Sequence, residues 1–167
     1  MKNFWRHLSS FIAPAMLGLV IPWVIVWAEN VKFARPALTT SIYLRILGAL
    51  VGGIGLILLI LTIRMFILLG DGTIMPWDPS RKLVIANMYA YVRNPMILSL
   101  IILQAGEAFL FRSPGIALLA VLNFAVNTIY FIASEEPGLE KRFGDEYREY
   151  RKNVPRWIPR LTPWHPA

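Results

Sequence analysis

The sequence contains no cysteine and only two histidines, His7 and His165, which stand near the two ends of the chain. The missing thiols exclude disulfides, thiolate nucleophiles and cysteine-ligated metals. A haem or di-metal centre inside the body of the protein would lack its usual histidine ligands. We therefore predict that the chain carries no metal site.

Charge is also scarce. Charged residues make up 16% of the 167 residues, hydrophobic residues make up 56%, and the mean hydropathy is +0.53. Soluble domains are on average about 25% charged and about 45–50% apolar. Together with the long uncharged runs described below, this composition predicts an integral membrane protein, and the length suits one compact domain.

The charges that remain are mainly basic, with a net charge of +7. In a soluble protein this balance would suggest nucleic acid as a partner. In a membrane protein, basic residues flank the spans and contact anionic lipid headgroups, each contributing roughly 1 kcal/mol near the surface. We expect anionic headgroups as partners and no nucleic acid.

Four apolar stretches are candidate membrane-spanning helices. Crossing a hydrocarbon core of roughly 30 Å takes about 20 helical residues, and shorter spans need help from their flanks. The four stretches are Leu8–Ala28, Ile46–Ile63 with a continuation to Leu69, Pro95–Phe111 and Pro114–Ser134. The predicted fold is all-α: a polytopic membrane bundle of about four transmembrane helices, followed by a C-terminal amphipathic helix and an irregular tail.

Small and polar residues interrupt these spans. Gly48 and Gly52 form a small-xxx-small pair, which favours close helix packing over homodimerisation. Asn123, Asn127 and Tyr130 share one side of the fourth span, where they form either an interhelical hydrogen-bond seam or the lining of a polar cavity. Glu107, in the third span, either lies at the interface or lines a polar pocket.

The segment Glu135–Arg160 holds seven basic and six acidic residues. Its apolar residues recur at steps of three or four, at Leu139, Phe143, Tyr147, Tyr150 and Val154. This spacing predicts an amphipathic helix that has Pro137 in its first turn and lies on the membrane surface. We expect a bend at Gly144–Asp145 with Asp145 as an N-cap, and an irregular tail over Val154–Ala167.

Basic residues also predict the orientation of the bundle. With four spans, thirteen basic residues fall on the side of the two termini, the loop Gly70–Arg93 and the tail, against four on the other side. The positive-inside rule then places both termini in the cytoplasm, most simply at the cell (inner) membrane. The loop and the tail therefore share one aqueous face.

Two motifs stand out, RKLVIANMYAYVRNPM at Arg81–Met96 and EEPGLEKRFGDEYREYRKNVPRWIP at Glu135–Pro159. Together they resemble the isoprenylcysteine carboxyl methyltransferase and phospholipid methyltransferase family of membrane enzymes. The matching residues are Leu83, Val84, Tyr89, Arg93, Asn94, Pro95, Glu135, Glu136, Leu139, Phe143, Gly144, Glu146, Tyr147, Tyr150, Val154, Pro155 and Pro159. The resemblance covers Gly70–Arg160 and divides the chain into two N-terminal spans (1–69) and a methyltransferase-like core (70–167).

The resemblance implies S-adenosylmethionine-dependent methyl transfer to a lipophilic substrate, such as a phospholipid, isoprenoid or prenylated carboxylate, that enters from the bilayer. The cofactor contacts it implies are Arg81, Lys82, Leu83, Val84, Tyr89, Asn94, Pro95, Met96, Ile97 and Glu135. It also offers an alternative for the apolar face of Glu135–Arg160, as a lid packed over the cofactor in place of a membrane anchor. The residues 131–134 lack the basic residue that prenylcysteine enzymes of the family carry before the paired glutamates. Arg156 is the candidate to replace it, and Arg156 and Glu107 are the candidate catalytic residues.

Two other functions fit the same spans. A sterol-reductase-like relative would bind NADPH in place of S-adenosylmethionine. A non-enzymatic membrane scaffold or transporter accessory, held by the amphipathic tail, would bind neither nucleotide.

Overall fold

The computed structural model describes residues 12, 14–33, 42–69 and 83–166. Its elements are η1 (Met16–Val20, a π-helix), α2 (Ile21–Phe33), α3 (Ile42–Leu69), η2 (Asn87–Ala90, a 3-10 helix), α4 (Pro95–Phe111), α5 (Pro114–Tyr130), η3 (Phe131–Glu135, a π-helix), α6 (Glu136–Phe143) and α7 (Asp145–Asn153). Every regular element within these ranges is helical, so the predicted all-α class is confirmed.

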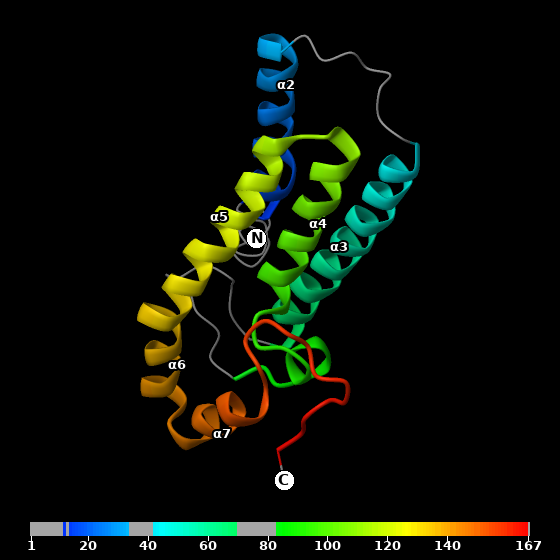
Figure 1. Cartoon of the computed structure of the whole chain (residues 1–167). Coiled ribbons are helices and arrows are strands. Elements are labelled where there is room, and N and C mark those ends of the chain that lie inside the picture. The colour runs from blue at the N-terminus through cyan, green and yellow to red at the C-terminus, as the bar shows by residue number, and fades with distance from the viewer. Residues whose placement is uncertain (1–11, 13, 34–41, 70–82, 167) are drawn as a thin grey trace, which may run out of the picture.

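The helices α2 to α5 run lengthwise through the molecule, and the polar segments gather at one end of it (Figure 1). The turn between α4 and α5 lies at the opposite end, whereas α6, α7 and the C-terminal tail lie near the start of α4 (Figure 1). The described part of the loop, residues 83–93, and the tail therefore lie on one face, as the sequence predicts. That face holds the candidate site.

Two helical stretches are long and apolar enough to cross a membrane, Ile42–Met65 and Pro114–Phe143. Met16–Asn30 and Pro95–Phe111 are apolar but shorter. The predicted second and third spans coincide with α3 and α4. The total of four spans stays a prediction.

The first helix extends further than predicted. The described part of the predicted span Leu8–Ala28 is helical, and α2 continues five residues beyond its predicted end, to Phe33. Glu29 explains the extension, because its Oε1 accepts a hydrogen bond of 2.9 Å from the backbone N–H of Gly115, in the first turn of α5. The first N–H groups of a helix have no acceptor within the helix, and Glu29 supplies an acceptor for one of them.

The fourth span does not stop at Ser134. The π-helical turn η3 joins α5 to α6 directly, and Pro137 stands in the first turn of α6. A π-helical turn inserts an extra residue, which lets the helix accommodate a proline without breaking. The break comes at Gly144, where φ is 57°, and Gly144 rather than Asp145 occupies the N-cap of α7. The tail after Asn153 contains no regular element up to residue 166, as predicted.

Glycines set the close approach of α3 and α4. A Cβ on Gly106 would collide with the backbone of Gly52, and a Cβ on Gly48 would lie 2.8 Å from the carbonyl oxygen of Gly106. Further along the two helices, a buried cluster fills the interface, with Leu59, Ile63, Leu100 and Leu103 as its members. The predicted close packing at Gly48 and Gly52 is thus confirmed within the chain.

The polar residues of the spans form a hydrogen-bond seam. Asn127 donates to the side chain of Asn123 at 2.6 Å, Asn123 donates to Gln104 at 3.2 Å, and Gln104 donates to the carbonyl oxygen of Leu17 at 3.0 Å. The seam connects α5, α4 and η1, and it fits the interhelical interpretation of these residues. Tyr130 does not belong to it, because its side chain is exposed.

Replacing Gly106 by alanine should destabilise the protein by roughly 1–3 kcal/mol, because the added methyl group forces α3 and α4 apart. Gly53→Ala is the matched control, since a Cβ there meets nothing within 4 Å. That change should be neutral or stabilise the helix by up to about 1 kcal/mol. Thermal unfolding of both variants in detergent measures the difference, and equal melting temperatures would contradict the packing argument.

Candidate functional site

The C-terminal tail lies along the loop that precedes α4. Three backbone hydrogen bonds join them: Arg93 N–H to Pro155 O at 2.9 Å, Arg160 N–H to Tyr91 O at 2.9 Å, and Trp164 N–H to Ala90 O at 3.0 Å. Backbone groups that would otherwise need water find partners in this pairing. The two sequence motifs therefore meet in one structure.

A hydrophobic cluster lies between the same two segments. Tyr147, Tyr150 and Val154 are buried at its centre. Residues of the loop, of α6 and of the tail pack around them: Leu83, Ile85, Leu139, Phe143 and Trp164. The prediction of a helix lying on the membrane surface is therefore wrong for this face, because its apolar residues are covered by the protein itself.

Glu136 is the centre of an ion-pair network. Its Oε1 accepts a hydrogen bond of 2.8 Å from Nη1 of Arg93 and one of 2.6 Å from Nε of Arg156. Its Oε2 accepts a third, of 3.0 Å, from Nη2 of Arg156. The side chains of Glu136 and Arg93 are each only 10% exposed, so water screens this pairing weakly. The network links the loop, α6 and the tail through one carboxylate.

Tyrosine hydroxyls extend this network. Arg93 donates to the hydroxyl oxygen of Tyr147 at 3.3 Å, and Tyr150 donates to the carbonyl oxygen of Tyr89 at 2.7 Å. Burial raises the pKa of both Tyr147 and Tyr150 above the usual range, so both hydroxyls stay protonated near neutral pH. The hydrogen bond of Arg156 to Glu136 likewise raises the pKa of the guanidinium.

Tyr89 and Glu135 interact electrostatically, although they stand 46 positions apart in the sequence. Burial of the ring, and then the negative charge of Glu135, raise the pKa of Tyr89. Both side chains are half-buried, one in η2 and the other at the end of η3. The Arg93–Glu136 pair explains how they meet, because it fixes the loop against the first residue of α6.

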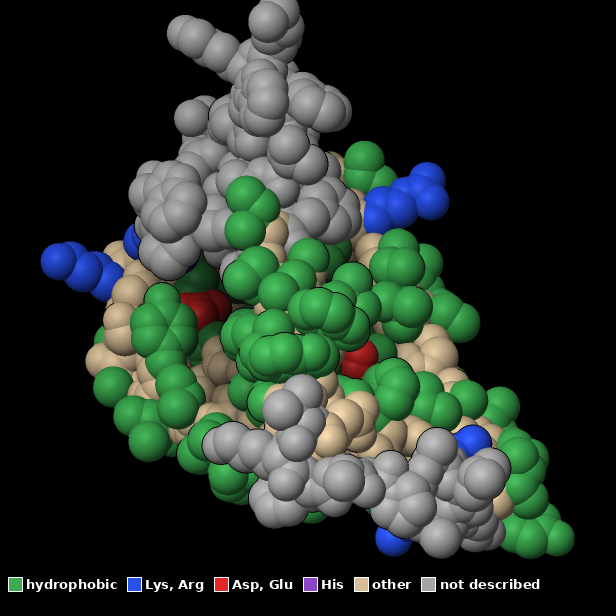
Figure 2. All heavy atoms as spheres, turned by 90° about the horizontal axis from the view of Figure 1, so that it is seen from above, with side chains coloured by type: hydrophobic (Ala, Val, Ile, Leu, Met, Phe, Trp, Pro, Cys, Tyr) green, Lys and Arg blue, Asp and Glu red, His purple; other side chains and the backbone are tan. Residues whose placement is uncertain are grey.

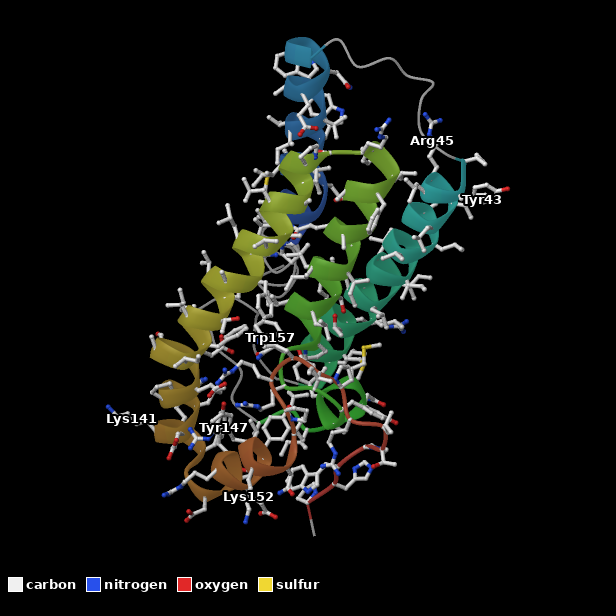
Figure 3. All side chains as sticks on the ribbon, viewed as in Figure 1. Tyr43, Arg45, Lys141, Tyr147, Lys152 and Trp157 are labelled. Atoms are coloured by element: carbon white, nitrogen blue, oxygen red, sulfur yellow. The ribbon has the colours of Figure 1, made fainter. Side chains whose placement is uncertain are left out.

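Two buried N–H groups at this site have no hydrogen-bond partner among the described residues, Nε of Arg93 and Nε1 of Trp157. The Trp157 ring packs between Phe124 and Phe131 of the α5–η3 helix, at centroid distances of 5.0 and 5.7 Å. Figure 3 shows Trp157 beside the lower part of α5, and Tyr147 of α7 below it, beside α6. The site thus offers unused donors as well as the Glu135 carboxylate.

Comparison with known proteins decides the family. A family model described as phospholipid methyltransferase matches residues 43–146, which is more than half of the chain. The chain belongs to the phospholipid methyltransferase family. A protein of Haemophilus influenzae, described as uncharacterized, is 46% identical over 60 residues, covering 35% of this chain and 92% of that protein. The predicted resemblance is confirmed, and the chain is a membrane methyltransferase by its family.

The structure brings together several residues that the resemblance to this family assigns to the cofactor. Val84 is buried, and Leu83 packs against Tyr147 and Tyr150. Asn94 occupies the N-cap of α4 without a side-chain hydrogen bond to the helix, and Pro95 follows as the first helical residue. These residues share the end of the methyltransferase that also holds Tyr89 and Glu135.

Other assigned residues lie elsewhere. Met96 packs against the core cluster of α3 and α4, which gives its side chain a packing role. Ile97 is half-buried in the first turn of α4. Arg81 and Lys82 fall outside the described residues. The cofactor contacts of all ten assigned residues stay predictions.

The two candidate catalytic residues are far apart. Arg156 belongs to the network described above and is held by Glu136. Glu107 stands twelve residues after Pro95, which along an α-helix corresponds to about 18 Å. The structure therefore separates Glu107 from Tyr89 and Glu135, and only Arg156 lies at this site.

Two residues of the site received no role from sequence reasoning: Glu136 and Trp157. Arg93 and Glu136 do match the family motifs, and their opposite charges were a signal that they pair. Trp157 follows the Val-Pro step of the second motif but is not a fixed position of it. Its contact with Phe124 and Phe131 depends on the fold of the tail, which the sequence does not reveal.

Glu136→Gln should destabilise the methyltransferase by roughly 3–5 kcal/mol, because two buried or partly buried guanidinium groups lose their counter-charge. Glu140→Gln is the matched control. Its partners Arg148 and Arg151 are exposed, and losing those pairs should change stability by at most about 1 kcal/mol. Thermal unfolding and proteolysis of the tail measure both changes. Similar losses in the two variants would argue against a central role for Glu136.

Proposed function

We propose that this protein transfers a methyl group from S-adenosylmethionine to a lipophilic substrate at the cytoplasmic face of the cell (inner) membrane. The substrate class is a phospholipid, an isoprenoid or a prenylated carboxylate. Family membership supports the methyl transfer. The observation that carries the proposal is the Arg93–Glu136 ion pair, which joins the two family motifs in one site beside Tyr89 and Glu135.

The polar groups of the site fit the cofactor. S-adenosylmethionine, when bound, supplies a methyl group on a positively charged sulfur. Its ammonium and ribose hydroxyl groups need acceptors, and Glu135 offers a carboxylate. Its carboxylate needs donors, and the buried Nε of Arg93 and Nε1 of Trp157 have no hydrogen-bond partner among the described residues. Unpaired buried donors are unfavourable, by about 1–3 kcal/mol each, so a ligand that pairs them gains that energy.

The residues around the site position and enclose the reactants. The hydrogen bonds of the tail to the loop, and the cluster of Tyr147 and Tyr150, keep water away from the loop side. Glu136 holds Arg93 and Arg156 in fixed places, with Arg156 available as a positioning residue beside the substrate. Methyl transfer requires alignment of donor and acceptor, and good positioning supplies roughly 7–11 kcal/mol of a barrier.

A lipophilic substrate has a short path to this site. The ring of Trp157 contacts Phe124, which is 43% exposed on α5. The exposed residues around it on the same helix are hydrophobic and include Leu122, Val126 and Ile129. This surface faces the bilayer in our proposal, so a hydrocarbon chain can approach Trp157 without crossing water. The excess of basic residues on the side of the tail supports the cytoplasmic orientation.

Glu135→Ala and Asn94→Ala should each weaken S-adenosylmethionine binding by at least about tenfold, the loss expected for one hydrogen bond to a charged group. Glu146→Ala is the matched control, because Glu146 is an exposed carboxylate on α7. Calorimetric titration of the detergent-solubilised protein measures the three affinities. An S-adenosylmethionine affinity equal to that of the wild type in both site variants would contradict the proposed site.

A thermal-shift assay of the same detergent-solubilised protein separates methyl transfer from the reductase and scaffold alternatives. Thermal shifts with S-adenosylmethionine and with its demethylated product are expected, and no shift with NADPH. A shift with NADPH alone would contradict methyl transfer and favour a reductase. The absence of a shift with all three ligands would favour a scaffold.

A further inference from the structure

A cavity lies away from the methyl-transfer site, between η1, α2 and the C-terminal half of α4. Its volume is about 450 Å³, within the size range of small-molecule sites. It is lined by Leu19, Val20, Pro22, Trp23, Val26, Glu107 and Phe111. Six of these seven side chains are apolar. In the view of Figure 2, acidic side chains lie recessed among hydrophobic ones on the face at this end.

Among the described residues of this lining, Glu107 is the only ionisable one. Its Oε2 is buried and has no hydrogen-bond partner among the described residues. Glu29 does not belong to this lining, and its Oε1 accepts a hydrogen bond from the first turn of α5. The seam of Gln104 and Asn123 does not account for Glu107 either, because its hydrogen bonds run to Leu17 and Asn127.

A carboxylate without a partner at membrane depth is unfavourable, and such residues pair with an opposite charge. The described lining of the cavity contains no basic residue. The complementary ligand is therefore a cation whose remaining surface is apolar. An ammonium group at the end of a hydrocarbon chain has this chemistry, since the ammonium donates to the carboxylate and the chain contacts the surrounding apolar side chains.

We propose that this cavity binds an amphiphilic amine, with its ammonium group on Glu107 and its hydrocarbon chain against η1 and α2. Leu19, Val20 and Trp23 are among the exposed hydrophobic residues, so the cavity opens towards the bilayer and the ligand enters laterally. The site is distinct from the methyl-transfer site, because about 18 Å of helix α4 separates Glu107 from Pro95. Its occupant is held without being methylated there.

Trp23 provides a direct readout. Brominated alkyl chains quench tryptophan fluorescence on contact, so 11-bromoundecylamine and its neutral match 11-bromoundecanol test the cavity in detergent-solubilised protein. The amine should quench wild-type fluorescence saturably and at lower concentration than the alcohol. Trp23→Phe should remove most of this saturable component, which assigns it to the cavity.

Glu107→Gln should weaken amine quenching by at least about tenfold, the loss expected for one charge-assisted hydrogen bond, and leave alcohol quenching unchanged. Equal amine affinity in the wild type and in this variant would overturn the proposal. So would an alcohol that binds the wild type as tightly as the amine.

A cavity-filling variant, Val26→Trp, keeps the test decisive if Glu107→Gln fails to fold. Saturable amine quenching should then disappear while the melting temperature stays near that of the wild type. Retained saturable quenching in a folded Val26→Trp protein would also overturn the proposal. None of these measurements depends on methyl transfer or on S-adenosylmethionine.

Discussion

The pairing of Glu136 with two arginines is the constraint on which the candidate site depends. One carboxylate connects a loop before α4, the start of α6 and the tail, and these segments come from three different parts of the sequence. Without a counter-charge, Arg93 and Arg156 would repel each other across the tail. With it, the tail takes its place over the loop, and Tyr89 and Glu135 become neighbours.

The continuous helix from Pro114 to Phe143 positions this carboxylate. The π-helical turn η3 lets the helix pass Pro137 without a break, so Glu135 and Glu136 remain rigidly attached to a long apolar helix. A flexible connection at Ser134 would have left both glutamates on a hinge. The turn therefore fixes the position of the site relative to α5. Gly144 supplies the bend after which α7 lies beneath the loop.

The sequence predicted features that depend on local patterns. Pro95–Phe111 and the region of α3 were correct because apolar runs bounded by arginine, proline and glycine define such helices. The periodicity also predicted the apolar face of Tyr147, Tyr150 and Val154, but the predicted membrane environment of this face was wrong. Periodicity shows that a face is apolar and does not show whether lipid or protein covers it. The Glu136 network and the role of Trp157 depend on contacts distant in sequence. For the Glu136 network, the opposite charges and the shared family motifs were the only indications in the sequence.

The hydrogen bond from Trp164 to Ala90 has a consequence for biosynthesis. Trp164 stands 74 positions after Ala90 in the sequence, so the loop before α4 lacks this partner until the ribosome has made the tail. The helices α4 and α5 are synthesised before that moment and can enter the membrane first. The site therefore closes only after the helices that carry it have been made.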